Sequence, residues 1–189
     1  MATDDITHRV RASVFAQEAE WRLEGDRLIW REATDSNSAR SGMIALDQVE
    51  SLRLTREPTR GGTRMFCRVR TRDGTAAHIA SAHYAGVLRN EDRSASYKDL
   101  VCELIARLAA VNPRVRFLAG ATRPVWWGVA LGIAALFGAL GALFAIAGRE
   151  MFTIRLIAGL ALVAFGAPNL IRWLKSNRPG TFDPANPPI

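Results

Sequence analysis

The sequence predicts an α+β fold in which an antiparallel sheet or open barrel is closed by one amphipathic helix and followed by a two-helix transmembrane hairpin. Three patterns indicate this order: apolar residues that alternate between turn glycines, one apolar stripe of helical period over 96–111, and two long apolar segments after residue 123. The 189 residues carry a net charge of +7, and nearly all the cations are arginines.

The first predicted hairpin turns at Gly25-Asp26, because glycine readily adopts the positive φ that a two-residue turn requires. That turn places Trp21 opposite Trp30 and Leu23 opposite Leu28. The apolar residues of both strands then share one face, as a sheet with one buried face requires. Further strands are expected over 43–46 and 50–55.

A second hairpin is predicted over 63–81, with a three-residue loop Arg72-Asp73-Gly74. A loop of this length sets apolar residues against apolar ones, and a slip by one residue would turn every side chain to the other face. The expected cross-strand pairs are Cys67–Ile79, Val69–Ala77, Arg68–His78 and Arg70–Ala76.

A helix is predicted over about 96–111, with Ser96 as its cap and Asn112-Pro113 as its stop. Its apolar residues recur at the spacing of a single helix face, and such a face needs a sheet to cover. The stripe consists of Tyr97, Leu100, Val101, Leu104, Ile105 and Leu108. Residues 1–120 are therefore expected to form one soluble, β-rich domain.

Two apolar segments, 124–147 and 152–174, predict a transmembrane hairpin over 124–174. The first has no charged residue, and a helix over its 23 residues 125–147 rises roughly 34 Å against a hydrocarbon core of ~30 Å. The short link around Gly148 puts both chain ends on one side, and more cations flank those ends than the link. We therefore expect an integral inner-membrane protein with both termini and a tail over 175–189 in the cytoplasm.

Small residues recur along both apolar segments, and such residues allow helices to approach closely in lipid. The simplest interpretation is that they pack the two helices of the hairpin together; a homodimer or contact with another membrane protein is the alternative. The candidate helix-packing residues are Gly128, Gly132, Gly138, Ala142 and Gly159.

The order of strands, one amphipathic helix and a hairpin resembles uncharacterised small bacterial membrane proteins with a pleckstrin-homology-like cytoplasmic domain. The tail over 175–189 is similar to the tails of such proteins. The resemblance implies a curved antiparallel sheet closed by a C-terminal helix. The segment VRFLAG (115–120) follows the helix here, which departs from that pattern. No lipid-binding residue is carried over, because no matching motif is present.

One face of the second hairpin is basic. Alternating residues of its first strand are arginines, and more arginines (Arg53, Arg56, Arg60) lie just upstream. Such a face suits anionic lipid headgroups or an acidic protein, although an ordinary solvated sheet face has the same composition. Nucleic-acid binding is not favoured, because no aromatic stacking platform accompanies the charge. The candidate contact residues are Arg64, Arg68, Arg70, Arg72 and His78.

Catalytic residues are not evident in the sequence. His83 and Cys102 could in principle form a nucleophile and base, but nothing in the sequence places them together or supplies an orienting group. Neither a metal-ligand spacing nor a phosphate-binding glycine loop occurs, so no cofactor is expected. The sequence thus predicts a membrane-anchored, non-enzymatic interaction or scaffold module. The alternatives are an accessory subunit of a membrane complex assembled through the hairpin and, third, a hydrolase that uses His83.

Overall fold

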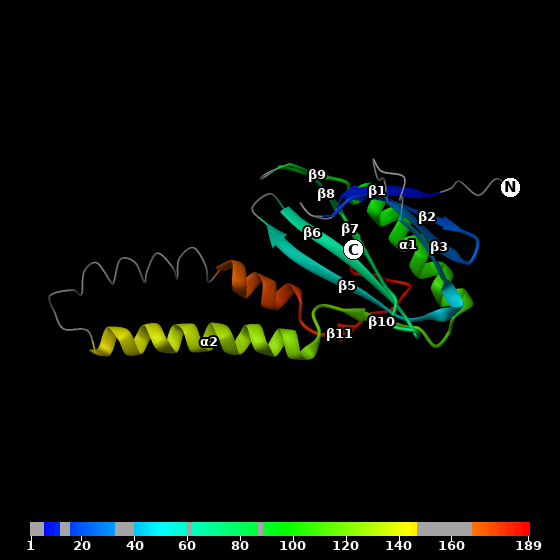
Figure 1. Cartoon of the computed structure of the whole chain (residues 1–189). Coiled ribbons are helices and arrows are strands. Elements are labelled where there is room, and N and C mark those ends of the chain that lie inside the picture. The colour runs from blue at the N-terminus through cyan, green and yellow to red at the C-terminus, as the bar shows by residue number, and fades with distance from the viewer. Residues whose placement is uncertain (1–5, 12–15, 33–39, 60–61, 87–88, 147–167) are drawn as a thin grey trace.

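The computed structural model describes residues 6–11, 16–32, 40–59, 62–86, 89–146 and 168–189. They form an α+β structure in which most of the strands precede the first long helix (Figure 1). The first sheet is antiparallel and has the strand order β1-β2-β3-β4. Its strands are β1 (Thr7–Arg11), β2 (Glu18–Glu24), β3 (Arg27–Glu32) and β4 (Ser41–Ala45).

The second sheet is mixed, with the order β11-β10-β5-β6-β7. Its strands are β5 (Val49–Thr59), β6 (Gly62–Thr71), β7 (Ala76–Ala80), β10 (Arg116–Ala119) and β11 (Gly180–Thr181). β10 runs parallel to β5, so the expectation of a purely antiparallel sheet is wrong. A separate ribbon pairs β8 (Ala82–Gly86) with β9 (Arg89–Asp92). Over the described residues the strands make separate sheets and no closed barrel.

Both predicted hairpins are confirmed in register. Trp21 lies opposite Trp30, and the turn glycine Gly25 has a φ of 52°. In the second hairpin Cys67 lies opposite Ile79, and Gly74 has a φ of 90°. Glycine at these two turns lets the strands keep the pairing that buries one apolar face.

The helix α1 (Ser94–Val111) covers the inner faces of the strands. All six residues of the predicted stripe are buried, and they share one core with residues of β1 to β7. The helix starts earlier than predicted, because the Asp92 carboxylate accepts the Ser94 N–H at 2.9 Å. Ser96 therefore lies inside the first turn and is not the cap.

Asn112 ends α1 and connects it to the sheet. Its buried amide donates to the carbonyl of Val49 at 2.8 Å and to that of Asp47 at 3.2 Å. These contacts fix the helix end against η1 (Leu46–Gln48), the short 3₁₀ turn that leads into β5. The segment after Asn112 is thereby directed back along β5, where it becomes β10.

The first apolar segment forms α2 (Arg123–Ile146), which extends away from the sheets (Figure 1). In the described part of the chain, no helix has both the length and the apolar composition that crossing a membrane requires. This finding contradicts the predicted transmembrane hairpin and, with it, the assignment to the inner membrane with both termini cytoplasmic. Most of the second predicted segment, 152–174, lies outside the described residues.

The C-terminal segment, expected as a separate tail, returns to the sheet (Figure 1). β11 pairs with β10, and the rings of Phe182 and Phe117 lie 5.6 Å apart. Asn177 is 1% exposed, and its side chain bonds both backbone groups of Arg56, accepting the N–H at 3.1 Å and donating to the carbonyl. These contacts cover the edge that β10 would otherwise leave open.

Candidate anion-binding site

The outer face of the second sheet carries the basic residues. Leu52, Leu54, Cys67 and Val69 are buried on the inner face, so the residues between them point outward. Arg53 of β5 lies directly opposite Arg68 of β6. Two like charges at paired positions destabilise a sheet, so this pair is not explained by sheet stability.

Two adjacent cross-strand rows build the face. In one row Arg53 lies between Leu118 and Arg68, and Arg68 in turn lies opposite His78 of β7. In the other row Ser51 lies between Arg116 of β10 and Arg70 of β6. A register shift between Val49 and Ser51 inserts Glu50 into β5, and this bulge brings Ser51 into line with Arg70.

The two rows enclose a hollow of about 250 Å³. Ser51 is small and 8% exposed and forms the floor of the hollow, whereas the residues around it have long side chains. Four guanidinium groups from three strands therefore surround one depression. The lining residues are Glu50, Ser51, Arg53, Arg68, Arg70, Arg116, Leu118 and Thr122.

Arg53 is fixed in position on the rim of this hollow. Its Nη1 donates to the carbonyl of Gly120 at 3.0 Å and to that of Ala121 at 3.2 Å. Burial lowers the pKa of Arg53, and the charges of Arg68 and Arg116 lower it further. The positive charges are thus close enough to repel one another, and an anion between them would relieve that repulsion.

The acids at the site do not neutralise it. Glu50 is the one carboxylate among the described lining residues, and it pairs with Arg116. Both side chains of that pair are well exposed, 62% for Arg116 and 39% for Glu50, so water weakens the pairing. Partial burial lowers the pKa of His78, and the neighbouring charge of Arg68 lowers it further.

The predicted contact residues divide between the hollow and its surroundings. Arg68 and Arg70 line the hollow, and His78 lies beside Arg68. Arg64 lies toward the other end of β6 with its guanidinium 5.4 Å from the centroid of the Phe66 ring. Arg72 follows the end of β6 and is exposed in the turn. The prediction missed Arg116. In the sequence this residue lies just before the first apolar segment, and no pattern there indicates that it joins the sheet.

The predicted helix-packing residues lie on α2 or beyond the described residues. A Cβ added at Gly128, Gly132 or Gly138 would meet nothing within 4 Å. Ala142 is exposed, and Gly159 lies outside the described residues. The helical stretch 168–176 contacts the start of α2 where Trp126 Nε1 donates to the Leu174 carbonyl at 2.9 Å. Helix packing through these glycines stays a prediction.

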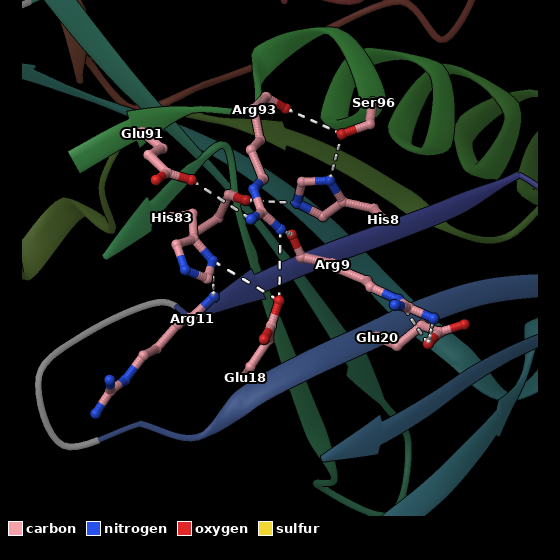
Figure 2. A network of polar contacts seen from close by, with 10 residues as sticks. His8, Arg9, Arg11, Glu18, Glu20, His83, Glu91, Arg93 and Ser96 are labelled. Atoms are coloured by element: carbon pink, nitrogen blue, oxygen red, sulfur yellow. Dashed lines mark hydrogen bonds and ion pairs between the residues drawn. The ribbon is translucent and has the colours of Figure 1, made fainter. Parts of the chain in front are cut away.

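His83 belongs to a polar network at the junction of β1, β8 and α1 (Figure 2). Its Nδ1 accepts the Arg11 N–H at 3.1 Å and lies 4.0 Å from a Glu18 oxygen. The residue is part of β8. Cys102 is exposed on α1 and lines a different depression, together with Ser96 and Asp99. The structure does not bring His83 and Cys102 together in one pocket.

No family model, curated protein or solved structure matches this chain. The resemblance to pleckstrin-homology-like proteins therefore stays a prediction.

Proposed function

We propose that this protein is a non-enzymatic interaction module that binds an acidic partner protein through the arginine face of its second sheet. The arginine face is defined by Arg53, Arg68, Arg70, His78 and Arg116. The observation that supports the proposal most directly is the cross-strand pair Arg53–Arg68, which sets two like charges side by side on a rigid sheet.

The paired strands fix the backbone positions from which these cations extend. Arg53 is anchored to two backbone carbonyls, and Arg68 and Arg70 alternate along a paired strand. Carboxylates bind guanidinium groups through two parallel hydrogen bonds, so a partner rich in Asp and Glu would complement this face. Electrostatic attraction of this kind increases the association rate and gives specificity.

The test is binding of the full-length protein to a fluorescent poly-glutamate peptide, followed by anisotropy at several salt concentrations. Reversing two exposed charges of the face, Arg68→Glu with Arg70→Glu, should weaken binding by at least about tenfold, because each close charge pair contributes on the order of 1 kcal/mol. The same change of net charge elsewhere, Arg27→Glu with Lys98→Glu, serves as the matched control, since both residues are exposed on other elements.

The control variant should retain affinity within about twofold apart from long-range effects that salt screens. Equal losses in the two variants would show that only net charge matters and would contradict the assignment to this face. Unchanged binding in the Arg68→Glu, Arg70→Glu variant would contradict it as well.

A further inference from the structure

We infer that the hollow at the centre of the arginine face is a receptor site for a phosphoryl group, whether on a phosphorylated segment of the partner or on a small phosphorylated molecule. The inference rests on the proposed function and names the group that the face recognises. It depends on the shape of the hollow, on its position beside a helix start and on its unbalanced charge.

The hollow has the shape that a compact tetrahedral anion requires. Arg116 and Arg70 flank Ser51 in one row, and Arg53 and Arg68 are paired in the next. Four arginines thus line one hollow, and guanidinium groups bind phosphate oxygens through two parallel hydrogen bonds. The hydroxyl groups of Ser51 and Thr122 add donors to the same lining.

The start of α2 lies at the edge of this hollow. The Thr122 carbonyl accepts the Trp126 N–H at 2.9 Å, so Thr122 is the N-cap residue immediately before α2. A helix of 24 residues has the positive end of its dipole at this point, and its first backbone N–H groups have no partner within the helix. Anions are stabilised at such a position, so the helix start acts in the same direction as the arginines.

The charge of the hollow suits a dianion better than a carboxylate. Four arginines face one lining acid, and that acid is already paired with Arg116. A single carboxylate would leave several of these cations uncompensated, whereas a phosphoryl group has about two negative charges and three acceptor oxygens at neutral pH.

Isothermal titration calorimetry on the full-length protein would measure this binding. The probes are inorganic phosphate, an acidic peptide with one phosphoserine, and the same peptide with unmodified serine. Tighter binding of the phosphoserine peptide than of either other probe identifies a phosphorylated segment as the source. Equal affinity for phosphate and phosphopeptide identifies a small phosphorylated molecule, because the peptide then adds nothing.

The variant Ser51→Leu tests the shape, because it fills the centre of the hollow without changing any charge. Binding of the phosphoryl probes should fall at least about tenfold, the loss expected when a bidentate contact is blocked. Since Ser51 is nearly buried, the exposed change Arg68→Gln provides an independent second test and should reduce binding similarly. Arg72→Gln removes an arginine outside the hollow and should leave binding within about twofold.

Competition separates this inference from the proposed function. If poly-glutamate binds the arginine face but phosphate neither binds nor competes, the phosphoryl site is refuted and the interaction module remains. If phosphate binds and poly-glutamate does not, the hollow is a phosphoryl site and the acidic-partner function is refuted. If neither binds, both fail. Equal phosphoryl affinity in Arg72→Gln and Arg68→Gln would also overturn the site.

Discussion

His8 is a histidine buried to 1% exposure between a strand and a helix. Its Nε2–H donates to the Ala80 carbonyl at 2.8 Å, and its Nδ1 accepts the hydroxyl proton of Ser96 at 2.9 Å (Figure 2). Both ring nitrogens are thus satisfied by a neutral imidazole. A second proton on the ring would reverse the direction of the hydrogen bond to Ser96, whose hydroxyl also lies 3.3 Å from the Arg93 carbonyl oxygen, and would place a positive charge where water does not reach.

The pH dependence of stability should therefore include a contribution from His8. Burial lowers the pKa of His8 from its ordinary value of 6.5, and the charge of Arg93 adds to the effect. Below about pH 6.5 His8 of the unfolded chain becomes protonated, whereas His8 of the folded protein stays neutral until the pH reaches its lower pKa. The free energy of unfolding should be at its full value above that pH and should fall as the pH drops.

Urea denaturation of the wild type and of His8→Gln between pH 7.5 and pH 5 checks this expectation. The variant should be less stable at pH 7.5 but should show a flatter profile. The hydrogen bond from Arg22 lowers the pKa of Glu20, but that carboxyl contributes only at more acidic pH. Parallel profiles for the two proteins would contradict the assignment to His8.

At the scale of the element, α1 buries its whole apolar stripe but carries one polar atom into the core. Tyr97 is 0% exposed, and its hydroxyl has no hydrogen-bond partner in the part of the chain that the structure describes. Burial raises the pKa of Tyr97, so the hydroxyl stays protonated. An unsatisfied buried hydroxyl costs about 1–3 kcal/mol, which the packing of the ring against the core and against His8 outweighs.

Tyr97→Phe should accordingly stabilise the protein by roughly 1 kcal/mol, because it removes the unsatisfied hydroxyl and keeps the ring. The free energy of unfolding from chemical denaturation is the measurement. Tyr84→Phe makes the same chemical change on a half-exposed strand residue and should shift stability by less than about 0.5 kcal/mol. A clear loss of stability in Tyr97→Phe would mean that the hydroxyl has a partner.

The elements also show how far the sequence could predict this structure. The hairpins at Gly25 and Gly74 were predictable in register because alternation and turn glycines act over a few residues. The pairing of β10 with β5 was not, because the strand has only four residues and its partner lies far away in the sequence. The same separation explains why the hollow was not predicted. Arg68 and Arg70 share a strand, whereas Arg116 joins them only through the tertiary fold.

At the scale of the whole molecule, Gly120 is where the domain, α2 and the C-terminal segment meet. Its φ is 72°, and a Cβ there would lie 2.3 Å from the Arg178 carbonyl oxygen and 2.6 Å from that of Asn177. Its own carbonyl accepts from Arg53, on the rim of the hollow. The residue therefore allows the C-terminal segment to approach the sheet at close range.

Gly120→Ala should destabilise the protein by roughly 1–3 kcal/mol, because the alanine combines an unfavourable φ with a clash against backbone atoms. Gly128→Ala is the matched control: the same change is made inside α2, where a Cβ meets nothing within 4 Å and helix propensity improves by up to ~1 kcal/mol. Thermal and urea unfolding measure both. Equal behaviour of the two variants would show that the C-terminal segment does not pack against Gly120.

The second sheet is completed by segments that lie far apart in the sequence, and this separation should set the order of folding. Arg53 and Gly120, which are hydrogen-bonded, are 67 positions apart, and Arg56 and Asn177 are 121 positions apart. Closing such long loops is entropically slow, whereas the two local hairpins need only short ones. Trp21 and Trp30 should thus become buried in an early kinetic phase, before β10 and the C-terminal segment dock. The hollow needs Arg116 of β10, so during refolding the fluorescence change of Trp21 and Trp30 should precede the recovery of affinity for anions.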